Sequence, residues 1–162
     1  MPAPTFPVVT PRWLDADQQR AWRNYLRGSA SLQEAINHDL EQSAGMSLSE
    51  YEVLVRLSEA EGRTLRMSVL ADELVHSRSR LTHTIRRMEA AGLVERTTCA
   101  EDRRGVNATL TDEGFARLEA AAPGHVESVR ARMVDRLTPE QMRVLGEIMS
   151  VFVDDDEETA EL

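Results

Sequence analysis

Apolar residues recur at helical spacing over most of the chain, and two short segments alternate instead. Over residues 15–42 the apolar positions repeat every three or four residues, which predicts a long amphipathic helix ended by Gly45. Ser47 begins a second helix, because S-L-S-E is a capping box in which Glu50 reaches back to the helix start. We expect this second helix to end near residues 61–62.

The next segment predicts two helices separated by a tight turn. A short strand is expected at 64–66, followed by a brief helix at 69–75 with Ser68 as its cap. The turn at 76–77 leads into a fourth helix that runs to the terminating Gly92.

A hairpin and two more helices complete the pattern. The strand-like segment 94–98 leads to a polar loop closed by Gly105, and apolar and polar residues then alternate over 106–110. A threonine caps a fifth helix over about 111–137, and Pro139 opens a sixth at its first helical position.

These elements predict a mainly α fold with a small β-hairpin wing. A helix, a turn, a second helix and a hairpin in succession form a winged helix-turn-helix, an arrangement that grips duplex DNA. We assign residues 1–11 to a flexible arm and residues 46–111 to a DNA-binding domain. Residues 12–45 and 112–153 form a helical dimerisation region, and residues 154–162 form an acidic tail.

Composition is that of a folded globular protein with an uneven charge distribution. Of its 162 residues 41% are hydrophobic, and the net charge is −9. Residues 76–104 nevertheless hold seven arginines and four acids, so the acidity lies away from the predicted reading surface. There is no apolar run of membrane-spanning length and no secretory leader pattern, and Cys99 is the single cysteine. We therefore expect a cytoplasmic protein without a membrane segment or an internal disulfide.

The fourth helix separates into an apolar and a polar face. Leu81, Ile85 and Met88 form the stripe expected to be buried. Arginine, serine, threonine and histidine occupy the other side, and arginine can bind guanine edges with two hydrogen bonds. The residues predicted to contact double-stranded DNA are Ser77, Arg78, Ser79, Arg80, Thr82, His83, Arg86 and Arg87.

The hairpin tip, E-D-R-R-G, adds a second predicted DNA contact. Arg103 and Arg104 would project into the narrow minor groove, where the negative potential is enhanced. Asp102 would repel a phosphate, so we expect it to hold a neighbouring arginine, Arg104, in a fixed orientation.

The ordered set of motifs resembles the MarR family. It comprises S-L-S-E-Y-E-V-L, L-A-D-E-L, S-R-S-R-L-T-H-T-I-R-R-M-E-A-A-G-L-V, D-R-R-G and L-T-D-E-G. The resemblance covers about residues 15–153 and implies a homodimeric winged-helix transcription regulator, usually a repressor. It implies a recognition helix in the major groove, which carries over to 77–87, and a wing arginine in the minor groove, which carries over to 102–104.

The sequence pattern also supports a dimer. The first, fifth and sixth helices carry more apolar residues than a small winged-helix core needs, and a monomer core is the alternative explanation. These residues are Trp13, Trp22, Val134, Leu145, Ile148, Met149, Val151 and Phe152.

Many MarR-like regulators bind small aromatic or phenolic anions between the dimer layer and the DNA-binding lobe. A candidate pocket here has one wall on the first helix and one on the second, although the same residues also suit an ordinary core. The candidate residues are Trp22, Tyr25, Leu26, Tyr51, Glu52 and Val55. The negative charge of Glu52 disfavours binding of an anionic ligand unless the Glu52 carboxylate is protonated or paired with a cation.

Other function classes have weaker support. The chain lacks the glycine and nucleophile motifs of common enzymes, and the four histidines show no metal-ligand spacing, so neither catalysis, a cofactor nor a metal is expected. A winged-helix module that binds protein rather than DNA remains an alternative because the net charge is negative. A redox-responsive regulator acting through Cys99 is another.

Overall fold

The computed structural model describes residues 11–74, 77–99 and 105–159, with side chains for all of these except Arg78 and 153–159. The helices are α1 (Ala16–Ala44), α2 (Leu48–Glu59), α3 (Met67–Glu73), α4 (Arg78–Ala90), α5 (Asp112–Arg132) and α6 (Pro139–Thr159). The strands are β1 (Thr64–Arg66), β2 (Val94–Thr98) and β3 (Val106–Leu110), and short 3₁₀ turns occupy Glu61–Arg63 and Val134–Arg136.

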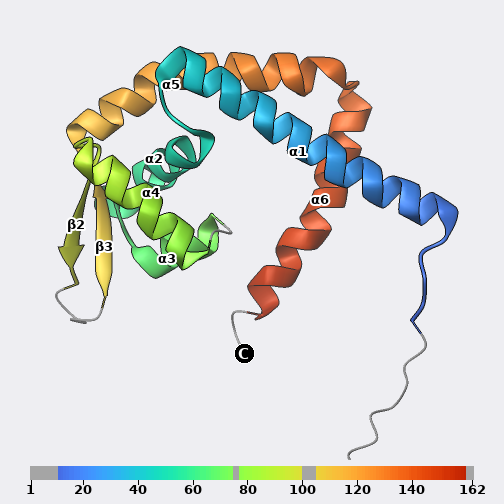
Figure 1. The fold of residues 1–162 in the computed structure, drawn as a ribbon, viewed down its shortest axis with the longest axis horizontal. Coiled ribbons are helices and arrows are strands. Elements are labelled where there is room, and N and C mark those ends of the chain that lie inside the picture. Colours follow the sequence, from blue (N-terminus) through green and yellow to red (C-terminus); the bar gives the residue numbers. More distant parts are fainter. Residues whose placement is uncertain (1–10, 75–76, 100–104, 160–162) are drawn as a thin grey trace, which may run out of the picture.

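The helices form an arch with a winged helix-turn-helix at one end. Helices α1 and α5 run side by side, while α2, α3, α4 and the sheet gather beneath them (Figure 1). Helix α6 turns away at the opposite end (Figure 1). The sheet is antiparallel with the order β1-β3-β2, so β3 pairs through Thr109 with both Thr64 and Glu95. The predicted class, mainly α with a small β wing, is confirmed.

Local signals in the sequence determine most of the helix boundaries. The Asp15 carboxylate accepts hydrogen bonds from the first turn of α1, and Gly45 ends that helix in the left-handed conformation with φ of 64°. The predicted capping box of Ser47 and Glu50 is present at the start of α2. Thr111 caps α5 by accepting the Gly114 N–H at 3.0 Å.

Two expectations about the helix boundaries were wrong. Ser68 does not cap α3, because the chain passes directly from β1 into the helix and Arg66 takes the N-cap position without a side-chain bond. Helix α5 ends at Arg132 rather than near residue 137. Helix α6 continues past Val153 to Thr159, since no glycine or proline interrupts it there, so the acidic segment is not wholly separate from the helix.

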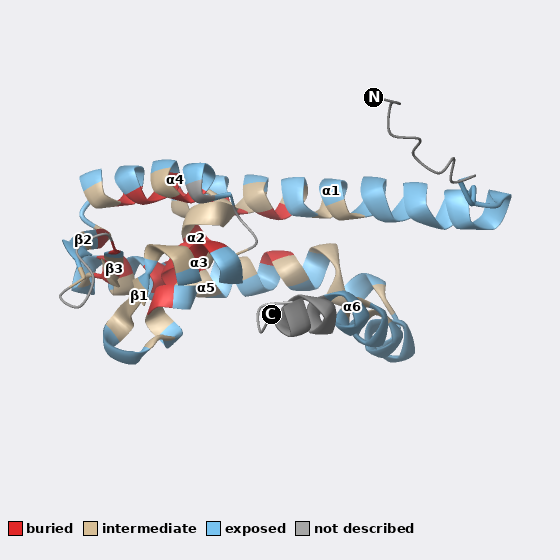
Figure 2. Ribbon diagram, turned by 90° about the horizontal axis from the view of Figure 1, so that it is seen from below, coloured by how far each residue is buried: buried red, intermediate tan, exposed pale blue. Residues whose placement is uncertain are grey.

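The hydrophobic core lies within the winged helix-turn-helix and beneath the inner half of α1. Helices α1 to α4 and strand β2 contribute fully buried side chains, which include Leu40, Leu54, Leu57, Leu70, Leu81, Ile85, Met88 and Val94. Figure 2 shows the buried segments gathered at this end of the molecule, while the outer half of α1 is exposed.

The segment before α1, the outer part of α1 and helix α6 leave large apolar side chains in contact with solvent in the single chain. The exposed fraction reaches 82% for Trp13 and 62% for Phe152. Further exposed apolar residues on these two helices are Trp22, Tyr25, Leu26, Met142, Val144, Ile148 and Val151. Large apolar side chains that gather on an exposed surface are typical of interaction sites.

One polar cluster joins α1 to α5. The Arg132 guanidinium donates to Asp39 through Nε at 3.0 Å and Nη2 at 2.8 Å, and the Ser128 hydroxyl donates to the same carboxylate at 2.6 Å. These hydrogen bonds, chiefly those from Arg132, lower the pKa of Asp39 from 3.8 to about 2. The ionised carboxylate therefore helps to hold the two helices together.

Asp39→Ala is expected to lower the melting temperature at neutral pH, because Arg132 and Ser128 lose their shared acceptor. Since the pKa of Asp39 is lower in the folded chain, its contribution is complete above about pH 4 and fades as the pH falls toward 2. Thermal unfolding of both proteins from pH 7 to pH 2 measures this difference. Asp17→Ala, which removes an exposed ion pair with Arg20, is the control and should change little. A pH-independent difference would contradict this account.

Candidate nucleic-acid interface

Helix α4 is fixed in the lobe by an apolar stripe. Leu81 and Ile85 are fully buried and Met88 is almost fully buried, as the sequence predicted. Thr84 lies on the same side and is also buried, which the sequence analysis did not anticipate. Ser77 caps the helix, with its hydroxyl accepting the Arg80 N–H at 3.3 Å.

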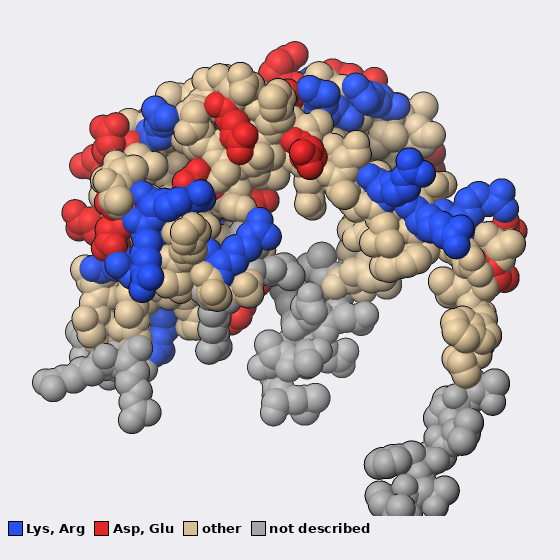
Figure 3. Space-filling view, viewed as in Figure 1, with Lys and Arg blue, Asp and Glu red and all other residues tan. Residues whose placement is uncertain are grey.

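The opposite side of α4 faces solvent. Ser79, His83 and Arg86 are exposed, and within the described part of the chain neither His83 nor Arg86 has a hydrogen bond or an ion pair. Basic side chains gather over this part of the molecule (Figure 3). Thr82 is half-buried at the edge of the face. The structure thus presents an exposed histidine and arginine on a helix whose other side is anchored.

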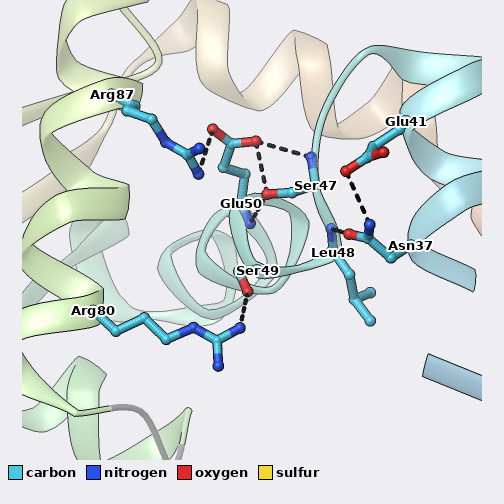
Figure 4. Close-up of polar contacts among 8 residues, drawn as sticks. All are labelled: Asn37, Glu41, Ser47, Leu48, Ser49, Glu50, Arg80 and Arg87. Atoms are coloured by element: carbon cyan, nitrogen blue, oxygen red, sulfur yellow. Dashed lines mark hydrogen bonds and ion pairs between the residues drawn. The ribbon is translucent and has the colours of Figure 1, made fainter. Parts of the chain in front are cut away.

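Two predicted contact residues are held by α2. Arg80 Nη2 donates to the Ser49 hydroxyl at 3.0 Å, and Arg87 Nη2 lies 3.3 Å from the Glu50 carboxylate (Figure 4). The sequence analysis assigned Glu50 only to the helix cap and gave Ser49 no role. Neither pairing has a sequence signal, because the partners lie 31 and 37 residues apart.

Arg96 belongs to the basic segment but is neutralised within the chain. Its Nε and Nη2 donate to Glu89 at 2.9 and 2.5 Å, and this guanidinium lowers the pKa of Glu89. The pair ties the end of α4 to β2. Arg96 is therefore a structural residue. One arginine fewer is available to a ligand, but the local charge surplus is unchanged because Glu89 is neutralised together with Arg96.

The predicted wing-tip residues Asp102, Arg103 and Arg104 lie outside the described residues, as does the side chain of Arg78. The base of the wing is described. The Cys99 N–H donates to the Gly105 carbonyl at 2.9 Å, and its thiol donates to the Asn107 side-chain oxygen at 2.8 Å. These two hydrogen bonds hold Cys99 against the start of β3 at the base of the wing.

The six predicted effector residues do not form one pocket in the single chain. Trp22 and Tyr25 stack on each other at 5.8 Å between ring centroids and, with Leu26, lie on the exposed outer half of α1. The part of α1 that reaches α2 is near Ile36, ten residues further on, or about 15 Å along the helix axis. This distance along a continuous helix separates the two groups of predicted residues within the single chain.

Tyr51, Glu52 and Val55 instead line a different cavity, of about 440 Å³, between α1, α2 and α5. Its other lining residues include Ile36, Leu48, Arg56, Glu73, Leu74, His125 and Val129. The Tyr51 and His125 rings lie 4.3 Å apart between centroids. Burial raises the pKa of Tyr51 and lowers the pKa of His125, so both are neutral at neutral pH. His125 Nδ1 is buried and has no hydrogen-bond partner in the described chain.

The described residues show neither a metal-binding cluster nor a membrane-spanning helix. Among the described residues, no three His, Cys, Asp or Glu side chains are grouped so that they could hold a metal ion. No described helix combines the length and the hydropathy needed to cross a membrane.

The chain is similar to several known transcription regulators. Residues 44–105 match the model of the MarR family. The chain is 32% identical over 128 residues to the HTH-type transcriptional repressor YetL of Bacillus subtilis, covering 74% of this chain and 77% of YetL. It is 35% identical over 86 residues to the HTH-type transcriptional regulator PecS of Dickeya dadantii, covering 52% of each protein.

A solved structure extends this similarity to the whole fold. Sco3205, a MarR family transcriptional regulator from Streptomyces coelicolor crystallised in complex with DNA, is 44% identical, with a TM-score of 0.85. The alignment covers 90% of this chain and 91% of that chain.

A second regulator from the same organism, AbsC, is 41% identical with a TM-score of 0.81, over 90% of this chain and 97% of its own. The winged lobe, the exposed face of α4 and these full-length similarities agree, and the chain therefore belongs to the MarR family, whose members are DNA-binding transcription regulators rather than enzymes.

Proposed function

We propose that the chain is a sequence-specific repressor that binds a pseudo-palindromic operator as a homodimer. Helix α4 enters the major groove, and Arg104 of the wing enters the adjacent minor groove. The observation that carries this proposal is the solvent-facing side of α4, where His83 and Arg86 are exposed opposite a fully buried apolar stripe. Repression is inferred from the relative YetL, which is a repressor.

The homodimer is supported by the exposed apolar surface of α1 and α6. Ile148, Val151 and Phe152 are each more than half exposed in the single chain, and burying such residues against a second copy removes apolar area from water. We assign 12–45 and 112–153 to this dimer region and 46–111 to DNA binding. A two-fold axis would then present two α4 helices to half-sites about one helical turn, or about 10 bp, apart.

A small aromatic or phenolic effector is proposed to bind the cavity between α1, α2 and α5. Its walls offer the paired rings of Tyr51 and His125, and the unpartnered Nδ1 can hydrogen-bond a ligand hydroxyl. Arg56 lines the same cavity and offers a positive charge to an anionic ligand beside Glu52. Because α2 packs against α4, a ligand here can shift the population away from the DNA-binding arrangement.

Arg86→Ala is expected to weaken binding to operator DNA, taken from the region upstream of the gene, by about 1–3 kcal/mol. It should also relax the preference at one base position in each half-site.

Arg104→Ala should lower affinity with little change in sequence preference. Binding of the native chain should fall with salt, with a log–log slope on the order of −0.9 per neutralised phosphate.

Fluorescence anisotropy over a salt series measures these quantities. Arg130→Ala is the matched control, because it removes an arginine of α5 that pairs with Asp135 and lies outside the predicted DNA-contact residues. Salt-insensitive binding, or an unchanged affinity of both Arg86→Ala and Arg104→Ala, would contradict the docking geometry.

Ile148→Glu is expected to convert the dimer into monomers and to abolish tight operator binding, since it introduces a charge into the proposed interface. Analytical ultracentrifugation measures the mass of each species. Val69→Glu, which changes an exposed residue on α3, should leave the dimer intact. A native chain that sediments as a monomer would refute the dimer.

A panel of phenolic and purine-like anions is expected to contain a compound that releases the operator. His125→Phe keeps the ring pair with Tyr51 but removes Nδ1, so it should still bind DNA and should bind that compound less tightly by about 0.5–1.5 kcal/mol. Titration of the protein–DNA complex measures the response. An equal response of native and variant proteins would exclude His125 as a ligand contact.

A further inference from the structure

The first turn of α2 contacts both the long helix α1 and the recognition helix α4. Figure 4 shows Ser47, Leu48, Ser49 and Glu50 lying between side chains of those two helices. Each of the four takes part in a hydrogen bond or an ion pair. This turn is therefore more than a helix cap.

Glu50 uses its two carboxylate oxygens for different partners. Oε2 accepts the Ser47 N–H at 2.9 Å and the Ser47 hydroxyl at 2.8 Å, which completes the capping box. Oε1 lies 3.3 Å from Arg87 Nη2. The Glu50 side chain is 19% exposed and that of Arg87 is 51% exposed. The cap thus fixes the carboxylate, and the more exposed arginine is oriented against it.

A side chain of α1 fixes this turn from the other side. Asn37 Oδ1 accepts the Leu48 N–H at 2.8 Å, and Asn37 Nδ2 donates to Glu41 one helical turn further along α1 at 2.9 Å. The free N–H at the start of α2 is therefore satisfied by α1 itself. As a result, the position of Glu50 is set relative to α1 as well as within α2.

Arg87 keeps most of its hydrogen-bonding capacity while Glu50 holds it. A guanidinium carries five N–H donors, and the ion pair is made through a single nitrogen. The remaining donors can reach a phosphate from the exposed half of the side chain. An arginine that is already oriented loses less conformational entropy when it binds, which favours association.

We infer that Glu50 is a positioning residue for DNA binding, which holds Arg87 in the orientation that contacts a backbone phosphate. This inference rests on the proposed operator binding. Glu50 itself touches no DNA in this account. Its negative charge is balanced by Arg87, so it does not repel the phosphate backbone as an unpaired carboxylate would.

The test compares Glu50→Gln, Arg87→Ala and the double variant in operator binding. Glutamine preserves the capping box and removes only the charge that orients Arg87. Glu50→Gln should weaken binding about two- to fivefold, the range expected for one partly exposed ion pair. In the Arg87→Ala background the same substitution should have no effect, because its target is gone.

Glu59→Gln is the matched control, since it removes an equal charge from the exposed end of α2, where Glu59 pairs with Arg56. Thermal unfolding checks that each variant is folded. If Glu50→Gln does not fold, Arg87→Lys replaces it, because lysine keeps the charge but lacks the rigid planar fork of donors that pairs with the carboxylate on one side and reaches a phosphate on the other. Arg87→Lys should then show the same two- to fivefold loss relative to the native chain.

Three results would overturn the inference. One is Glu50→Gln binding operator as tightly as Glu59→Gln does, which would mean that Glu50 does not position Arg87. Tighter binding by Glu50→Gln would likewise overturn the inference, because it would mean that Glu50 competes with DNA for Arg87. The third is an equal loss in the presence and absence of Arg87. Failure of the native chain to bind operator would instead refute the proposed function, so the two failures are distinguishable.

Discussion

Burial of one side of α4 is the constraint on which the rest of the arrangement depends. Leu81, Ile85 and Met88 are removed from water almost completely, and each such side chain stabilises the fold by about 1.5–3 kcal/mol. Rotating the helix by one residue, about 100°, would expose this stripe. The direction in which His83 and Arg86 point is therefore set by core packing rather than by their own contacts.

The sequence predicted the parts of the fold that local chemistry determines. Gly45 and the capping box at Ser47 mark helix ends through interactions within a few residues, and both predictions are confirmed. Ser68 failed as a cap because the path of the chain out of β1, not cap preference, sets the start of α3. The contacts of Arg80 and Arg87 with α2 join residues more than thirty positions apart, and no spacing rule reveals them.

Acidic residues orient arginines on and beside α4 in this chain of net charge −9. Glu89 on α4 pairs with Arg96 on β2, and Glu50 on α2 pairs with Arg87 on α4. Asp39 acts in the same way on Arg132, further along the arch. Helix α1 is continuous, and within the single chain its outer half, with Trp22, does not reach the cavity beside Tyr51.

The most direct test of the central claim is selection of bound sequences from a pool of random duplexes. Two copies of α4 fixed by a dimer should enrich an inverted repeat whose half-site centres lie about one helical turn, or about 10 bp, apart. Recovery of such a repeat would support the account. Enrichment of a single half-site, or of no sequence at all, would contradict it.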